Sequence, residues 1–83
     1  MDILYFAWVR EAVGTSCEHL DPPAEVIDVR GLIAWLAARS PGHESGLGNA
    51  AALRAAVDQK FVDLNALIAG AREVAIFPPV TGG

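Results

Sequence analysis

A single amphipathic helical pattern between residues 29 and 39 constrains the fold most. Its apolar residues recur at the helical spacing i, i+3, i+4 and i+7, and they are Val29, Leu32, Ile33 and Leu36. Asp28 precedes the pattern and is a suitable N-cap, because its negative charge complements the helix dipole. One apolar stripe can cover only one face of a sheet. The pattern therefore predicts a two-layer α+β sandwich with one main helix.

Short apolar segments around this helix predict five strands, at residues 3–9, 15–20, 53–57, 61–63 and 73–77. The first segment, Ile3 to Val9, is an almost continuous apolar run, which is typical of a strand buried on both faces. Residues 10–14 predict a short helical turn closed by Gly14. Because the link between the first two strands is short, we expect them to pair antiparallel.

Residues 40–52 are expected to be mostly irregular. Ser40-Pro41-Gly42 is predicted to end the main helix. We interpret residues 43–49 as a surface loop, since its glycines lack the lysine and helix that accompany them in phosphate-binding loops. Residues 50–52 could form a short helix. Three apolar residues are expected to hold a closing loop or helical turn before the last strand: Leu64, Leu67 and Ile68.

Composition narrows the partners that the chain can have. Its 83 residues make one domain with a marginal core, and 53% hydrophobic residues allow an apolar surface for a protein partner. A net charge of −4 without a basic patch argues against nucleic acid. No apolar run approaches the roughly 20 residues that span a bilayer. With one cysteine, Cys17, and no signal peptide, we expect a cytoplasmic protein.

The last residues combine a strand with a slim arm. Two prolines, Pro78 and Pro79, end the apolar strand 73–77, because proline cannot donate to a sheet ladder. The six residues after Phe77 could reach at most roughly 20 Å from the body. They end in Gly82-Gly83, which lacks side chains and could enter a narrow channel. We expect a domain over residues 1–77 and a flexible carboxyl-terminal tail over residues 78–83.

Residues 73–83, EVAIFPPVTGG, resemble the C-terminus of the MoaD family, the small sulfur carrier subunits of molybdopterin synthase. Arg10-Glu11 and Gly14, after an apolar first strand, also match the family pattern. Asp58 stands where the family commonly has asparagine, and residues 69–72 replace a more acidic turn. The resemblance implies the ubiquitin-like β-grasp fold: a mixed five-stranded sheet with one main helix packed on one face, and the first and last strands parallel at its centre.

The same resemblance implies the chemistry. An E1-like activating enzyme would consume ATP to adenylate Gly83, and sulfur transfer would convert the adenylate to a thiocarboxylate. The large subunit of molybdopterin synthase would then use this sulfur on cyclic pyranopterin monophosphate, in molybdenum cofactor biosynthesis. The family implies a heterotetramer of two carriers and two large subunits. The carrier itself would be the non-catalytic subunit of this sulfurtransferase, with no bound cofactor or metal.

On this hypothesis Gly83 is the reacting residue and carries the sulfur. The residues before it are expected to contact the partner: Phe77, Pro78, Pro79, Val80, Thr81 and Gly82. The prolines would hold the root of the tail extended, which reduces the entropy lost when the tail is threaded. Phe77 could equally belong to the buried core.

Other functions remain open at the level of sequence. The chain could carry sulfur for thiamin synthesis or tRNA thiolation, modify other proteins as ubiquitin does, or be a binding module with incidental glycines. Cys17 and His19 could face the same side of a strand as a thiolate–imidazole pair. Together with His43 they are still too few ligands for a zinc site. Asp58 and Asp63 are expected to be solvated.

Overall fold

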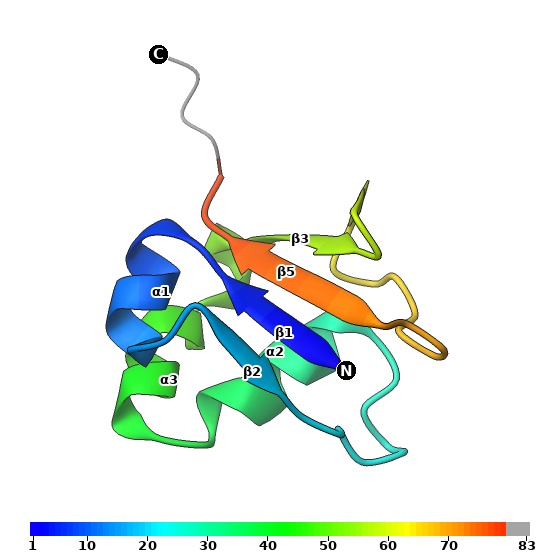
Figure 1. The fold of residues 1–83 in the computed structure, drawn as a ribbon, viewed down its shortest axis with the longest axis horizontal. Coiled ribbons are helices and arrows are strands. Elements are labelled where there is room, and N and C mark those ends of the chain that lie inside the picture. The colour runs from blue at the N-terminus through cyan, green and yellow to red at the C-terminus, as the bar shows by residue number, and fades with distance from the viewer. Residues whose placement is uncertain (80–83) are drawn as a thin grey trace.

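A computed structural model describes residues 1–79 and contains a five-stranded mixed sheet (Figure 1). The elements in chain order are β1 (Asp2–Tyr5), α1 (Ala7–Val13), β2 (Cys17–His19), α2 (Val29–Ala37), α3 (Pro41–Leu47), the 3₁₀ helix η1 (Ala50–Ala52), β3 (Arg54–Val57), β4 (Lys60–Val62) and β5 (Glu73–Phe77). The strands lie in the order β2-β1-β5-β3-β4. This is the predicted α+β sandwich, with three α-helices where the sequence indicated one main helix.

Strand β5 lies at the centre of the sheet. It pairs parallel with β1, with Ile3 opposite Val74, and antiparallel with β3, with Ala55 opposite Ile76. The outer pairs β1–β2 and β3–β4 are antiparallel. The predicted parallel pairing of the first and last strands is therefore confirmed. Because β5 has hydrogen-bonded neighbours on both edges, its end is a firm base for whatever follows.

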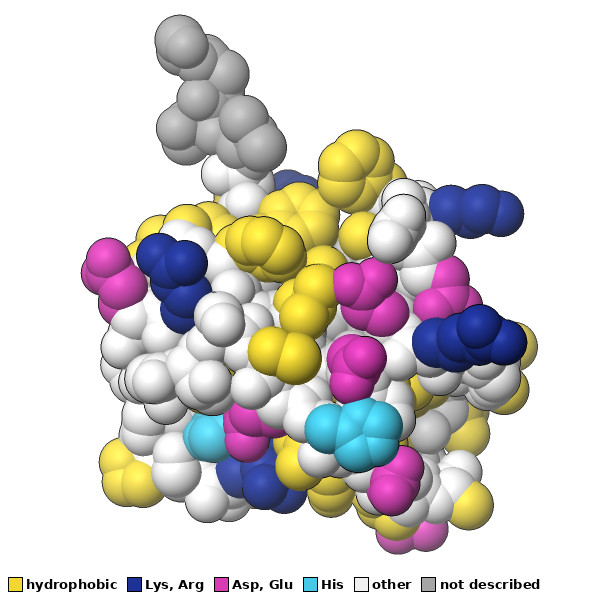
Figure 2. All heavy atoms as spheres, in the orientation of Figure 1, with side chains coloured by type: hydrophobic (Ala, Val, Ile, Leu, Met, Phe, Trp, Pro, Cys, Tyr) yellow, Lys and Arg dark blue, Asp and Glu magenta, His cyan; other side chains and the backbone are white. Residues whose placement is uncertain are grey.

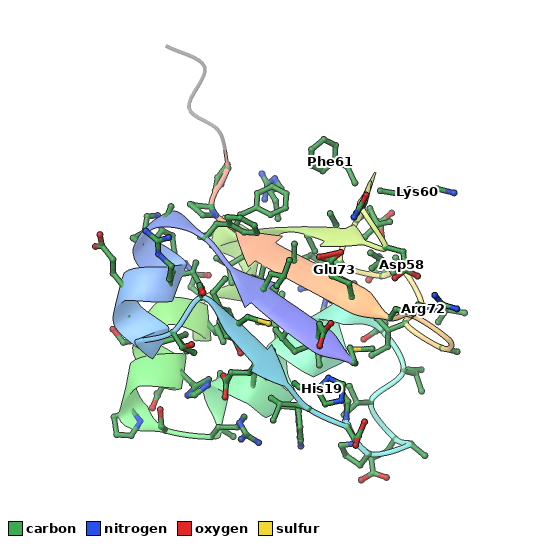
Figure 3. The ribbon with its side chains drawn as sticks, viewed as in Figure 1. His19, Asp58, Lys60, Phe61, Arg72 and Glu73 are labelled. Carbon is green, nitrogen blue, oxygen red and sulfur yellow. The ribbon has the colours of Figure 1, made fainter. Side chains whose placement is uncertain are left out.

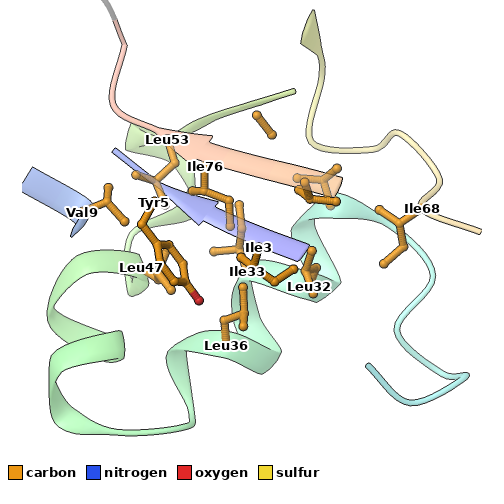
Figure 4. Packing of buried hydrophobic residues seen from close by; sticks show 13 residues of the cluster. Ile3, Tyr5, Val9, Leu32, Ile33, Leu36, Leu47, Leu53, Ile68 and Ile76 are labelled. Carbon is orange, nitrogen blue, oxygen red and sulfur yellow. The ribbon is translucent and has the colours of Figure 1, made fainter. Parts of the chain in front are cut away.

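The two faces of the sheet differ sharply in burial. Side chains alternate along a strand, and one set of positions faces the helices, where Ile3 and Ile76 are fully buried. The core that they form is drawn in Figure 4 and contains Ile3, Tyr5, Val9, Val29, Leu32, Ile33, Leu36, Leu47, Leu53, Ala55, Ile68, Val74 and Ile76. Within the described part of the chain no helix covers the other set, which includes Leu4 and Ala75, and we call that side the open face.

Helix α2 follows the predicted apolar stripe, and all four stripe residues are buried. The Asp28 carboxylate accepts a hydrogen bond from the Gly31 amide at 2.7 Å, which confirms the predicted N-cap. The amides of Val29 and Arg30 donate to backbone carbonyls of Ala66 and Leu64. These contacts satisfy donors that a helix start leaves free. The helix ends at Ala37, two residues before the predicted Arg39.

The prediction of one strand over residues 3–9 was wrong beyond Tyr5. Phe6 is still extended, but Ala7 has a φ of +53°, and α1 begins there. Val9 is buried from a helix rather than from a strand. A continuous apolar run carries no period, so it does not indicate where a strand gives way to a helix. Gly14, at φ +94°, closes α1 in the left-handed conformation, as predicted for this position.

The prediction of a surface loop over residues 43–49 was also wrong. Residues 41–47 form α3, with Pro41 in the first turn and the Ser40 hydroxyl accepting from the His43 amide at 3.1 Å. The helix packs on α1 through glycines: a Cβ at Gly42 would lie 2.6 Å from the Ala12 carbonyl oxygen. Glycine lowers helix propensity but permits this close approach. The low helix propensity of the glycines led to the prediction of a loop, although Ser40-Pro41 is a typical start of a helix.

Smaller differences concern strand lengths and one apolar residue. β2 covers only residues 17–19 of the predicted 15–20, and β4 begins at Lys60. Ile68 is buried and Leu64 half-buried, as expected, but Leu67 is 69% exposed and does not pin the loop. Within residues 1–79, no helix combines the length and the apolar character needed to cross a bilayer.

Candidate functional site

The root of the predicted tail is fixed at the end of β5. The strand ends at Phe77, as the sequence predicted, and Phe77 pairs with Arg54 of β3. On the other edge the Phe6 amide donates to the Ile76 carbonyl at 3.2 Å. Both neighbouring segments therefore hold the end of β5 just before Pro78. The other predicted site residues, Val80, Thr81, Gly82 and Gly83, lie outside the described residues, and their roles stay predictions.

An apolar groove of about 620 Å³ opens beside this root on the open face. We call it the tail-root groove, and its lining residues are Phe6, Ala7, Ala56, Phe61, Ala75, Phe77, Pro78 and Pro79. Ala56 and Ala75 pair across β3 and β5 and form a shallow floor. Figure 2 shows hydrophobic side chains gathered on the face of the molecule near the end of β5. All lining side chains among residues 1–79 are apolar, so this part of the chain suits the groove to a protein surface and offers it no group for acid–base chemistry.

Aromatic side chains form the walls of the tail-root groove. Phe61 of β4, labelled in Figure 3, is 86% exposed. Its ring contacts that of Phe77 edge-on, with centroids 5.8 Å apart. Phe6 is 46% exposed. Phe77 thus belongs to the open face rather than to the core, which resolves the alternative left by the sequence. An exposed aromatic cluster of this kind is a usual mark of a protein-binding surface.

Sequence reasoning missed Phe6 and Phe61. Phe6 was hidden in the run that we predicted as a buried strand. Phe61 sits opposite Ala56, which in turn sits opposite Ala75 of β5. These pairs place Phe61 on the same face as the tail root. Counting two-residue periods from the predicted turn at residues 58–60 could have found it.

The far half of the open face is charged. His19 contacts Asp2 across strands, with Nδ1 2.8 Å from the carboxylate oxygen, and both side chains are exposed. Asp58 is exposed as expected, but it also accepts hydrogen bonds from the amides of Arg72 and Glu73 (Figure 3). Asp58 therefore ties the β3–β4 turn to the start of β5.

Cys17 is exposed, and the His19 ring is hydrogen-bonded to Asp2. The possible thiolate–imidazole pair of Cys17 and His19 is therefore not formed. Among the described residues, no group of three or more His, Cys, Asp or Glu side chains is placed to hold a metal ion.

A hydrogen-bonded cluster around Glu18 joins α3 to the sheet. One Glu18 carboxylate oxygen accepts from the Tyr5 hydroxyl at 2.9 Å and lies 2.6 Å from His43 Nε2. His43 Nδ1 lies 2.7 Å from the Ser40 hydroxyl. Burial raises the pKa of Glu18, but the hydrogen bonds from His43 and Tyr5 outweigh it and leave that pKa below its ordinary value. The sequence indicates His43 only as a possible metal ligand. In the structure its contacts with Ser40 and Glu18 join α3 to the sheet.

Tyr5 belongs to the same cluster from the sheet side. Its pKa is strongly raised, first by burial, then by the hydrogen bond to Glu18 and by the Glu18 charge. The two shifts together favour an ionised Glu18 beside a neutral Tyr5. The cluster lies on the helix side of the sheet, away from the tail-root groove. We therefore assign it to stability rather than to the site.

Comparison with known proteins agrees with this geometry. The model of the ThiS family matches residues 3–83. The chain is 40% identical to the molybdopterin synthase sulfur carrier subunit of Escherichia coli (strain K12), over 98% of this chain and 96% of that protein. It is 34% identical to the subunit of the same name from Mycosarcoma maydis, over 98% and 90%. The crystal structure of SAMP1 from Haloferax volcanii shares the fold, with a TM-score of 0.75, 24% identity and coverage of 100% and 98%. The chain therefore belongs to the ThiS family and, with these relatives, to the family of the molybdopterin synthase sulfur carrier subunits.

Proposed function

We propose that this chain is the sulfur carrier of a molybdopterin synthase. The observation that carries the proposal is similarity over nearly the full length to two proteins of that name. A second support is the placement of the strand that leads to Gly82-Gly83. It lies at the sheet centre, and its end borders an apolar groove whose described lining residues carry no acid–base group. A carrier needs these features, because its chemistry takes place in the active sites of other proteins.

The reactive group would be the carboxylate of Gly83. A carboxylate is a poor electrophile, so an activating enzyme would first join it to AMP from ATP, with pyrophosphate leaving. A sulfur donor would then displace AMP and leave a thiocarboxylate on Gly83. In the large subunit of the synthase, this sulfur would pass to cyclic pyranopterin monophosphate, and the carrier would return as the carboxylate. The carrier binds no cofactor in this scheme, and ATP is consumed by the activating enzyme.

The tail-root groove is proposed as the docking surface for these partners. Phe61 and Phe6 are the exposed aromatic anchors, and Phe77 with Pro78 and Pro79 continues the same surface toward the tail. Docking there would align the tail with a partner's channel while burying the rings. Aromatic side chains often supply most of the binding energy at such surfaces. The exposed ring of Phe61 is therefore expected to matter most.

The first experiment is intact-mass analysis of the protein after incubation with ATP, a sulfur donor and the activating enzyme of its host. The expected result is a mass gain equal to the replacement of one oxygen by sulfur, localised by fragmentation to Gly83. A variant lacking Gly83 is the matched control and should not gain mass. No gain on the intact chain, with an activating enzyme that thiolates another carrier, would refute the carrier function.

The second experiment separates the proposed pathway from the alternatives. The thiocarboxylated protein is mixed with the large subunit and cyclic pyranopterin monophosphate, and the dithiolene product is measured. Sulfur transfer only to a thiamin precursor or to tRNA would assign the chain to another thiolation pathway. Isopeptide conjugates on lysines of other proteins would instead indicate a ubiquitin-like modifier.

Docking is tested by Phe61→Ser, measured by binding to the large subunit. We expect at least a tenfold loss of affinity, which corresponds to about 1.4 kcal/mol. Ile27→Ser is the control, because Ile27 is also an exposed apolar residue but lies outside the tail-root groove. Equal affinities for the two variants would place the docking surface elsewhere.

A further inference from the structure

Ala7 has a left-handed backbone conformation, with a φ of +53°. A Cβ makes this conformation unfavourable, so isolated residues that adopt it are usually glycines. Gly14 and Gly70 follow this rule. The other non-glycine residues with positive φ within residues 1–79 are Asp58 and Gln59, which form the two-residue turn between β3 and β4. Such a turn requires positive φ at both residues. Ala7 lies in no hairpin turn, so its conformation needs another explanation.

Packing of the core does not account for the methyl group of Ala7. Ala7 is exposed and is not part of the buried cluster. It is instead one of the residues that line the tail-root groove. Residues that keep an unfavourable backbone conformation are concentrated at functional sites, where the surrounding structure holds them in place. The conformation of Ala7 therefore directs attention to the groove that it lines.

The conformation of Ala7 allows Phe6 to belong to two elements at once. Phe6 is extended after β1, and its amide donates to the Ile76 carbonyl at 3.2 Å. The Phe6 carbonyl accepts from the amides of Val9 and Arg10, at 3.1 and 3.3 Å, where α1 begins. The chain thus passes from β1 to α1 through a single residue (Figure 1). Both backbone groups of Phe6 are held, and its half-exposed ring lines the tail-root groove.

We propose that Ala7 is a positioning residue for docking, because its backbone conformation holds Phe6 in the tail-root groove. A glycine at position 7 would relieve the strain, but it would also admit further backbone conformations. Phe6 would then have to be ordered when a partner binds, and this ordering lowers affinity. The inference rests on the proposed function, since it takes the tail-root groove as the surface that meets the large subunit.

The test is Ala7→Gly in the full chain, with two measurements on the same preparation. Thermal unfolding should give a melting temperature that is not lowered, because the relief of strain offsets the greater freedom of glycine in the unfolded chain. The affinity for the large subunit of molybdopterin synthase should fall by about fivefold. A residue that served only the fold would not lower affinity while leaving the melting temperature intact.

Gly70→Ala is the matched control and should give the reverse result. Gly70 has a φ of +77°, and an added Cβ would meet nothing within 4 Å, so the substitution introduces backbone strain alone. Gly70 lies before the start of β5, at the end opposite to the tail root. The melting temperature of this variant should fall by about 5 °C. Its affinity for the large subunit should stay unchanged.

Phe61→Ser, measured in the same binding assay, separates this inference from the proposed docking surface. Unchanged affinity of Ala7→Gly, while Phe61→Ser binds more weakly, would overturn the role of Ala7 and leave the docking surface in place. Weaker binding by Ala7→Gly but not by Phe61→Ser would also overturn it, because the effect would not pass through the groove. A lowered melting temperature of Ala7→Gly would assign the alanine to the fold. If the unmodified chain does not bind the large subunit, the proposed function fails together with this inference.

Discussion

The two faces of strand β5 differ in what they contribute. On the helix side, Val74 and Ile76 are fully buried in the core. On the open side, Ala75 and Phe77 line the tail-root groove beside the exposed Phe61. One strand thus anchors the domain with alternate residues and lines the proposed docking surface with the others. Stability and recognition can be changed separately in this arrangement, because neighbouring residues serve different purposes.

Ile76→Ala is the variant with the largest expected effect, and it tests whether the two faces act separately. Removing the buried side chain should lower the free energy of unfolding by about 3 kcal/mol, through lost burial and the cavity left behind. Urea denaturation followed by circular dichroism measures it. Phe77→Ala, at the next position, should cost about 1 kcal/mol yet weaken docking more. Similar losses of stability in both variants would mean that the two faces are not independent.

A second prediction concerns the close packing behind the sheet. Gly42→Ala should cost about 2 kcal/mol, because the new Cβ would lie 2.6 Å from the backbone oxygen of Ala12 and α3 would have to move from α1. Gly46→Ala is a milder variant, since its Cβ would lie 3.1 Å from the Ala12 Cβ. We expect the order Gly42→Ala, then Gly46→Ala, in thermal unfolding. The reverse order would contradict the described contact of α1 with α3.

The Glu18 cluster predicts a pH dependence on the helix side. The folded-state pKa of Glu18 is lowered, so its contribution is fully present above the unfolded value near 4.3 and is lost as pH falls through the folded pKa. Glu18→Gln should therefore be less stable at pH 7, by about 1 kcal/mol. The difference from the unmodified protein should shrink toward pH 3. Denaturant titrations at several pH values measure this.

Tyr5→Phe is the companion to that variant. It removes one hydrogen bond but leaves the carboxylate and His43 in place, so part of the acid sensitivity should remain. A stability difference for Glu18→Gln that stayed constant between pH 7 and pH 3 would exclude an ionised Glu18 as the source.

The smallest effect on stability is expected for Phe61→Ser. Its side chain is 86% exposed, so the free energy of unfolding should change by less than about 0.5 kcal/mol. Thermal unfolding of both proteins under the same conditions is the measurement. A large loss of stability would show that the Phe61–Phe77 ring contact stabilises the domain. The open face would then contribute to stability as well as to docking.

The sequence predicted the architecture where its patterns had a clear period. The α2 stripe, the Asp28 cap and the end of β5 at Phe77 were all found, because each rests on local spacing or on proline chemistry. The prediction from sequence failed where helix propensity and close packing favour different residues. In α3, Gly42 and Gly46 oppose helix formation locally but permit the contact with α1.

The sequence predicted only those residues of the candidate site that are consecutive along the chain. Phe77, Pro78 and Pro79 are consecutive, so the sequence alone could group them. Phe6 and Phe61 join them only through the pairing of β1, β5, β3 and β4. Contacts made across a sheet depend on register, and a one-residue shift would move Phe61 to the other face.

The position of β5 between two paired neighbours also bears on mechanical resistance. Ladder hydrogen bonds run across the strands, perpendicular to them in antiparallel pairs and slanted in parallel pairs. A pull on the chain beyond Phe77 therefore acts along β5 and shears its bonds to β1 and β3 together, instead of opening them one after another. The domain is therefore expected to resist a pulling force applied to this end of the chain. The same force applied across an edge strand such as β2 would break the hydrogen bonds of that strand one at a time.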